Sequence, residues 1–234
     1  SSYFSLMSFI KRFDNYGKYT FYKMFFYFAI MFASPFFAVY MRNELHFSYA
    51  TLTVITMSSS VFYLIFTPLV GRFSDKFGNV KLLYLSNALF VLSPLCWLFL
   101  KSPISLLFVP QLIAGLANAA GILASTNFTY DSVNPQHRGI CVAYESLFIG
   151  VGVFAGSLLG GFLLKYSDSF TAFNAFFLVF ILAAVLRLAV GIVFLPMIKE
   201  VRKTKKMPAF HLNLAHPFKT IHAQIGWFRA ITRK

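Results

Sequence analysis

The side chains that could do chemistry in this chain form two polar stripes, and the chemistry they offer is hydrogen bonding. Between residues 48 and 70 they recur at alternating spacings of four and three, which places them on one helix face: Tyr49, Thr53, Thr56, Ser60, Tyr63 and Thr67. Between residues 105 and 127 the corresponding set is Gln111, Gly115, Asn118 and Ser125. Two interpretations stay open: hydrogen bonds between helices, or a water-filled route for a polar solute. On the second interpretation the cavity candidates are Thr53, Thr56, Ser60, Tyr63, Gln111 and Asn118.

The elements that must position these stripes are long apolar segments. The chain has 234 residues, of which 58% are hydrophobic and 12% charged, against about 25% charged in typical soluble proteins. So little polar surface excludes a water-soluble globule, and the same numbers exclude disorder, collagen and coiled coil. A helix needs about 20 residues to cross a bilayer. Six blocks are long enough: residues 20–41, 48–70, 80–100, 105–127, 140–164 and 170–196. The sequence therefore predicts an all-α membrane protein of six transmembrane helices, with consecutive helices as antiparallel neighbours.

Groups for covalent catalysis and metal binding are missing from these blocks. No Ser/His pair, paired aspartates or His-Glu-x-x-His pattern occurs within them, and the histidines lie outside. Cys96 and Cys141 have no C-x-x-C or histidine spacing and are typical of small buried hydrophobes. The net charge of +14 comes from short polar segments and a basic tail rather than a nucleic-acid-binding motif. We expect no enzyme, no cofactor, no metal site and no nucleic-acid partner.

The distribution of basic residues predicts the orientation in the membrane. One side holds the N-terminal segment, the turn at 71–81, Arg138 and a tail with nine Lys or Arg residues, and the other side holds only Arg42, Lys101 and Lys165. Cytoplasmic segments carry the excess of Lys and Arg, so both termini are predicted to be cytoplasmic in a multi-pass protein of the cell membrane. The predicted division is a cytoplasmic segment (1–19), a six-helix bundle (20–196) and a basic cytoplasmic tail (197–234). In that tail Phe218, Ile221, Ile225 and Phe228 have helical spacing, which fits either an amphipathic surface helix or a solvated tail.

The turn after the second block carries a recognisable pattern. It reads Gly71-Arg72-Phe73-Ser74-Asp75-Lys76-Phe77-Gly78-Asn79-Val80-Lys81. This resembles the signature turn of the major facilitator superfamily, Gly-x-Leu-Ala-Asp-Arg-x-Gly-Arg-Lys, although Phe73 and Asn79 depart from it. Two glycines would allow a turn of four to eight residues to reverse between helices. The resemblance implies that Asp75 holds the cytoplasmic side shut against a second bundle; a turn that only orients the protein is the other interpretation. The expected gate motif is Gly71, Arg72, Asp75, Lys76, Gly78 and Lys81.

Two further segments fit the same resemblance. The connector at residues 130–139 looks like the superfamily's acidic-then-Arg connector, and we expect a gate charge network of Asp131, Arg138 and Glu145 together with Arg72 and Asp75. Gly152, Gly156 and Gly160 recur at a four-residue spacing that permits close helix contact in lipid. They partly resemble the glycine-rich fifth helix of the superfamily's antiporters. The Gly-Pro element of that signature is absent, which weakens the interpretation as a proton-exchanging drug exporter.

The resemblance implies one half of a permease. Superfamily members have two six-helix halves, each made of two inverted three-helix repeats, with solute bound between the halves. We expect this chain to be a fragment, or else to pair with a copy; residues 34–41 and 199–202 resemble a C-terminal half. The implied function is movement of a small solute, with or without a coupling ion, by alternating access. The expected partners are the lipid bilayer, the other half and the solute, and the alternative is a non-transporting membrane scaffold.

Charged residues inside the blocks are few. Arg187 in the sixth block is expected to snorkel or to pair with polar groups of a neighbouring helix rather than to bind solute. No Asp or Glu lies near the middle of any block, so no proton-coupling site is expected in this half.

Overall fold

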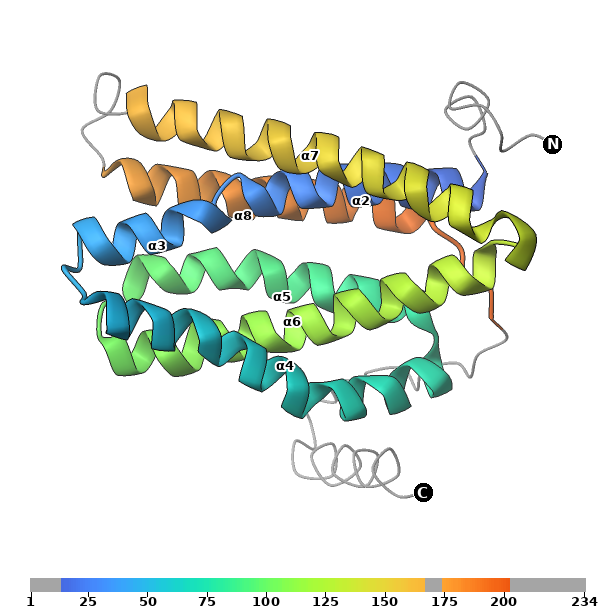
Figure 1. Ribbon diagram of the computed structural model, residues 1–234, viewed down its shortest axis with the longest axis horizontal. Helices are drawn as coiled ribbons and strands as arrows, with labels where there is room; N and C mark the ends of the chain where they lie inside the picture. The colour runs from blue at the N-terminus through green and yellow to red at the C-terminus, as the bar shows by residue number, and fades with distance from the viewer. Residues whose placement is uncertain (1–13, 167–173, 203–234) are drawn as a thin grey trace, which may run out of the picture.

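The computed structural model describes residues 14–166 and 174–202. Figure 1 shows long helices running side by side. They are α2 (Asn15–Met31), α3 (Ser34–Asn43), α4 (Tyr49–Phe77), α5 (Asn79–Phe99), α6 (Pro103–Ser132), α7 (Arg138–Tyr166) and α8 (Ala175–Phe194). Short 3-10 turns occupy Pro135–His137 and Leu195–Met197. Helices α2 and α3 form one interrupted span, so the described chain has six spans long and apolar enough to cross a membrane. The all-α, six-helix prediction is confirmed, and the stripe at residues 218–228 lies outside the described residues.

The turn expected at residues 71–81 is much shorter in the structure. Helix α4 continues to Phe77 and α5 begins at Asn79, so Gly78 alone joins them, with a φ of 95°. That φ is costly for residues with a Cβ, which explains a glycine at this position. Gly71 lies within α4 and has open space beside it. The expectation that two glycines serve the turn is therefore wrong, because the change in composition at residue 70 does not mark the end of the helix.

The helices that pack most closely are often not consecutive in the chain, and several of these contacts are made at glycines. Helix α2 packs along α7, α4 along α6, and α5 along both α6 and α8, whereas the consecutive pairs α4–α5 and α7–α8 touch only lightly. A Cβ on Gly152, Gly156 or Gly160 would collide with backbone atoms of α2, so these glycines bring α7 directly onto that helix. A Cβ on Gly115 would likewise collide with the backbone of α4. Consecutive helices were expected to be neighbours; α5 and α6 pack closely, whereas most other consecutive helices make smaller contacts than helices further apart in the chain.

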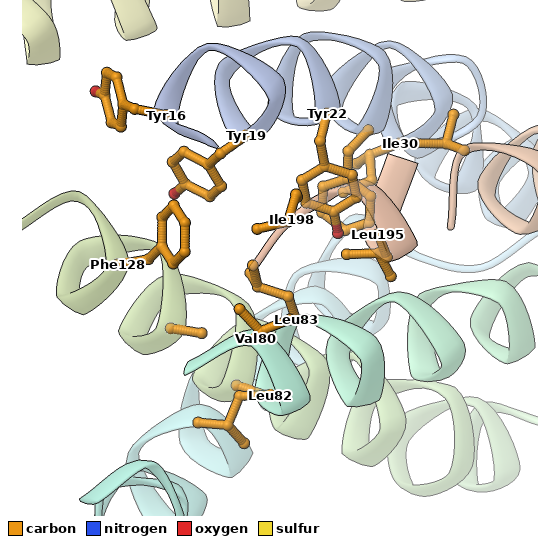
Figure 2. Packing of buried hydrophobic residues seen from close by; sticks show 14 of the residues in the cluster. Tyr16, Tyr19, Tyr22, Ile30, Val80, Leu82, Leu83, Phe128, Leu195 and Ile198 are labelled. Atoms are coloured by element: carbon orange, nitrogen blue, oxygen red, sulfur yellow. The ribbon is translucent and has the colours of Figure 1, made fainter. Parts of the chain in front are cut away.

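Two aromatic clusters fill the interior. Figure 2 shows Tyr16, Tyr19 and Tyr22 projecting from α2 into the first cluster, with Phe128 of α6 beside Tyr19. The ring centroids of Tyr19 and Phe128 lie 4.5 Å apart. The second cluster lies toward the other end of the bundle and joins α3, α5 and α8 through Tyr40, Trp97 and Phe180. Residues of both clusters line the central cavity described below.

The first span breaks between α2 and α3. Pro35 is the second residue of α3, and the Ala33 amide donates to the carbonyl of Ile30 rather than to that of Ala29. The Ser34 hydroxyl also donates to Ile30, over 2.8 Å. A proline removes one backbone donor from a helix, so carbonyls near the break need other partners.

Candidate functional site

A central cavity of about 360 Å³ lies inside the bundle. Residues from α2 to α6 and from α8 line it, and three of the six predicted cavity residues are among them: Thr56, Gln111 and Asn118. The hydroxyl of Thr56 donates to Leu52 and the amide of Asn118 to Ala114, each within its own helix. These bonds do not tie the two helices together through those side chains. The arrangement thus fits a hydrated lining better than interhelical bonding at these two positions.

The other predicted cavity residues lie elsewhere. Thr53 and Ser60 are exposed on α4, while Tyr63 packs against the first aromatic cluster. The cavity also has an aromatic lining that the polar stripes do not reveal, including Phe26, Phe37, Phe90 and Trp97. These rings belong to helices with nearly uniform apolar composition, so their sequence spacing gives no signal for the cavity.

Asp75 of the gate motif and Asp131 of the gate charge network share a cation from beyond the last long helix. Arg202 Nε lies 2.7 Å from Asp131 Oδ2, and Arg202 Nη1 lies 3.7 Å from Asp75 Oδ1. Asn79 also donates to Asp131, over 3.0 Å. Nearby, the amide of Val80 donates to Glu200 over 2.8 Å. Residues 198–202 therefore cross the end of the bundle where α5 begins.

The remaining gate residues are placed as follows. Lys76 and Lys81 approach the ring of Phe77, at 5.6 and 5.7 Å from its centroid. Arg138 donates to the carbonyl of Tyr130 over 3.0 Å, and Arg72 is exposed on α4. Asp75 and Asp131 of the expected network thus meet through Arg202, a residue that sequence reasoning assigned only to the basic tail.

Glu145 belongs to a different cluster from the one expected. Its Oε1 bonds Lys23 Nζ of α2, and its Oε2 accepts from the Tyr16 hydroxyl at 2.7 Å and the Thr129 hydroxyl at 3.0 Å. The side chains of Lys23 and Glu145 are 10% and 8% exposed. Because α7 begins at Arg138, Glu145 lies about two turns inside the bundle, facing α2. The sequence held a signal for this pair, since Glu145 is the only acidic residue within the six apolar blocks and Lys23 lies in the first.

The Lys23–Glu145 pair lies between two cavities. A second cavity of about 230 Å³ is lined by both Lys23 and Glu145, together with residues of α6. Lys23, Tyr27, Ile122 and Ser125 line this cavity and the central cavity alike. Lys23 therefore lies in the wall that the two cavities share, and Glu145 faces the second cavity only.

Arg187 is buried at the centre of the bundle, with 1% of its surface exposed. Its guanidinium donates to the carbonyls of Ala29 at 3.2 Å, Ile30 at 3.1 Å and Phe90 at 2.8 Å. Ala29 and Ile30 are at the break between α2 and α3, and Phe90 lies four residues before Pro94 in α5. Arg187 thus pairs with backbone groups of neighbouring helices, including a carbonyl that Pro94 leaves without its usual donor.

The sequence comparison decides the family. Residues 20–231 match the family model described as Major Facilitator Superfamily. This chain belongs to the major facilitator superfamily. Its six apolar spans and its superfamily membership identify a multi-pass membrane protein.

Curated relatives in the superfamily match parts of the chain. Multidrug resistance protein 2 of Bacillus subtilis is 28% identical over 119 residues, covering 51% of this chain and 30% of the relative. The class B tetracycline resistance protein of Escherichia coli is 27% identical over 141 residues, covering 60% and 33%. Multidrug export protein EmrB of Haemophilus influenzae is 29% identical over 122 residues, covering 52% and 24%. The chain thus spans about a third or less of the length of these relatives.

The site offers noncovalent chemistry. Within residues 14–166 and 174–202, no group of three His, Cys, Asp or Glu side chains could hold a metal ion. What the superfamily bundle presents is an aromatic and polar cavity with two buried cations beside it. A lining of this kind can hold an organic molecule through apolar contacts and hydrogen bonds.

Proposed function

We propose that this chain is one half of a major facilitator permease that moves a small solute across the cell membrane by alternating access. The observation that carries the proposal is the central cavity, because Thr56, Gln111 and Asn118 present polar groups to a space of about 360 Å³ within membrane-spanning helices. Polar side chains at such a depth are kept where they face protein or water. The names of the relatives, multidrug and tetracycline resistance proteins, support an organic molecule as the solute.

A second six-helix bundle is the proposed partner. The most apolar windows of α4 and α7 are only 11% and 22% buried, whereas those of the other four spans are 39–44% buried. The least covered helices are therefore α4 and α7, and the cavity residue Thr56 lies on one of them. We assign this chain to the C-terminal half, with both termini in the cytoplasm.

The proposed gate uses Asp75. Its side chain is 78% exposed, and Arg202 at 3.7 Å is a loose partner. An exposed pair of this kind contributes about 1 kcal/mol or less to stability. Asp75 can therefore exchange partners at little cost when a second bundle approaches, which is what a gate requires.

Thiol labelling of the full-length protein tests the proposal. Single cysteines replace Thr56 or Asn118 in a background where Cys96 and Cys141 are serine, and a membrane-impermeant maleimide is added to either side of sealed vesicles. Alternating access predicts that each position reacts from both sides, at rates that change in opposite directions when the population of states shifts. Ala124→Cys is the control, because Ala124 is 0% exposed and should stay protected.

The same labelling separates the proposal from the scaffold alternative. A scaffold has no need to expose its interior, so Thr56 and Asn118 would stay protected from both sides. That result, together with no solute flux in reconstituted vesicles, would overturn the permease assignment.

A further inference from the structure

The charged lining of the central cavity is cationic. Among the residues that the structure describes, Lys23 and Arg187 are the charged side chains that line it, and no carboxylate joins them there. Glu145 lies behind Lys23 and lines only the second cavity. A solute in the central cavity therefore meets positive charge from this half of the protein.

The two cations differ in how firmly the protein holds them. Three N–H groups of Arg187 are held by the carbonyls of Ala29, Ile30 and Phe90, so its guanidinium is fixed. The ammonium of Lys23 has three N–H donors, and within the described chain its oxygen partner is one oxygen of Glu145. Its other neighbours are the rings of Tyr19 and Tyr27, at 5.6 and 5.9 Å. Each cation therefore keeps two N–H donors, but only Lys23 is held by a single hydrogen bond and can turn these donors toward a ligand.

Glu145 is built to tolerate sharing of Lys23. The hydroxyls of Tyr16 and Thr129 both donate to its second oxygen. If Lys23 turned toward the central cavity, Glu145 would retain these two hydrogen bonds. A buried carboxylate that keeps two donors has a smaller desolvation penalty than one left bare. Lys23 can therefore exchange the carboxylate of Glu145 for the acidic group of a solute while Glu145 keeps two hydrogen-bond donors.

The rest of the cavity fits the body of an organic molecule. Rings of Phe26, Phe37, Phe90 and Trp97 provide apolar surface, and Gln111 adds a polar group to the lining. Cavities of roughly 300–1,000 Å³ with an apolar lining and a few polar groups are typical of small-molecule sites. The cavity thus offers a place for an aromatic body as well as for an acidic group.

We propose that Lys23 binds the acidic group of an amphipathic organic anion in the central cavity, in exchange for part of its contact with Glu145. The inference rests on the proposed transport function and specifies the chemical class of solute. Arg187 adds positive potential from its fixed position, while the aromatic rings hold the apolar body.

A matched pair of probes tests the inference with the purified full-length protein. 2-Naphthoate and 2-naphthylmethylammonium share one ring system and differ in the sign of their charge. Equilibrium dialysis should show at least tenfold tighter binding of the anion. Lys23→Met should abolish this preference, Lys23→Arg should keep it, and Glu145→Gln should strengthen anion binding because the competing carboxylate is gone.

Lys101→Met is the matched control, because Lys101 is exposed at the far end of the bundle and lines neither cavity. It should leave the preference for the anion unchanged. Wild-type protein that prefers the cation, binds both probes equally or binds neither overturns the inference, and this comparison does not depend on whether any variant folds. A preference for the anion that persists in Lys23→Met also overturns the inference.

The failure of this inference can be told from the failure of the proposed function. A protein that shows two-sided thiol labelling at Thr56 and moves solute, yet prefers the cationic probe, remains a permease with a different solute class. A protein without two-sided labelling and without flux loses the permease assignment itself.

Discussion

Arg187 should contribute to stability by occupying carbonyls that helix breaks leave without donors. Arg187→Leu removes donors from Ala29 and Phe90, whereas Ile30 retains the Ser34 hydroxyl at 2.8 Å. A buried acceptor left unsatisfied costs about 1–3 kcal/mol, so two of them lower the free energy of unfolding by about 2–6 kcal/mol. Removing a buried cation offsets part of this loss, since its desolvation penalty disappears. The net effect is best measured as a difference between two backgrounds.

Pro94→Ala provides the second background. The new amide of residue 94 can donate to Phe90, four residues earlier, which is the carbonyl that Arg187 now occupies. In the Pro94→Ala background, Arg187→Leu should therefore lower the free energy of unfolding by about 1–3 kcal/mol less than in the wild type, because the Phe90 carbonyl is no longer left unsatisfied. The desolvation of the guanidinium is common to both backgrounds and cancels in the double-mutant cycle. Free energies of unfolding in mixed micelles give the four values.

Pro110→Ala is the control for this cycle. Pro110 also lies inside a helix and lines the central cavity, but its carbonyl partner in α6 is not bonded to Arg187. It should give no rescue. Equal losses on Arg187→Leu in the wild-type and Pro94→Ala backgrounds would show that the contact with Phe90 has no role in stability, and would refute the reasoning.

Three further substitutions test the packing and the gate. Gly156→Leu should disrupt the contact of α7 with α2, because even a Cβ there collides with backbone atoms of Phe28; folded yield in detergent should fall sharply, whereas Gly150→Leu, with open space beside it, should be tolerated. Equal yields of the two variants would contradict close packing at Gly156. Asp75→Asn should shift the full-length protein toward the cytoplasmically open state, seen as faster labelling of a cavity cysteine from that side; an unchanged rate on both sides would argue against the gate role. Arg202→Gln should shift the protein toward the cytoplasmically open state less than Asp75→Asn does, because the contact between Arg202 and Asp75, at 3.7 Å, is loose.

The membrane spans were predictable from the sequence, because the length and apolarity of a segment determine whether it can cross a bilayer without its neighbours. All six blocks correspond to helical spans in the structure. Helix ends were less predictable: α4 continues past its apolar block to Phe77, since a helix can extend beyond the hydrocarbon core without a change of backbone conformation. Helix pairing depends on where small residues meet a facing backbone. Gly156 shows this, because its four-residue spacing indicated close contact but not with which helix.

The candidate site was predictable only in part. Thr56, Gln111 and Asn118 line the central cavity, and the sequence singled them out because polar side chains at helical spacing stand out against an apolar background; their contact with a solute stays a prediction. Glu145 was assigned to the wrong cluster, because its distance from the helix end suggested the membrane surface while its side chain points to Lys23. Arg202 was missed as a partner because a basic residue in a basic tail carries no signal for a particular contact.

Both buried cations act on the same element. Lys23 belongs to α2 and ties it to α7 through Glu145, while Arg187 of α8 binds α2 at Ala29 and Ile30, beside its break. Helix α2 is thus held at two points along the wall of the central cavity, one by an ion pair and one by backbone carbonyls. The ion pair can exchange its partner for another acid, whereas the carbonyl contacts cannot be replaced by a solute. Any movement of α2 that accompanies binding should therefore pivot near Arg187 and be largest near Lys23.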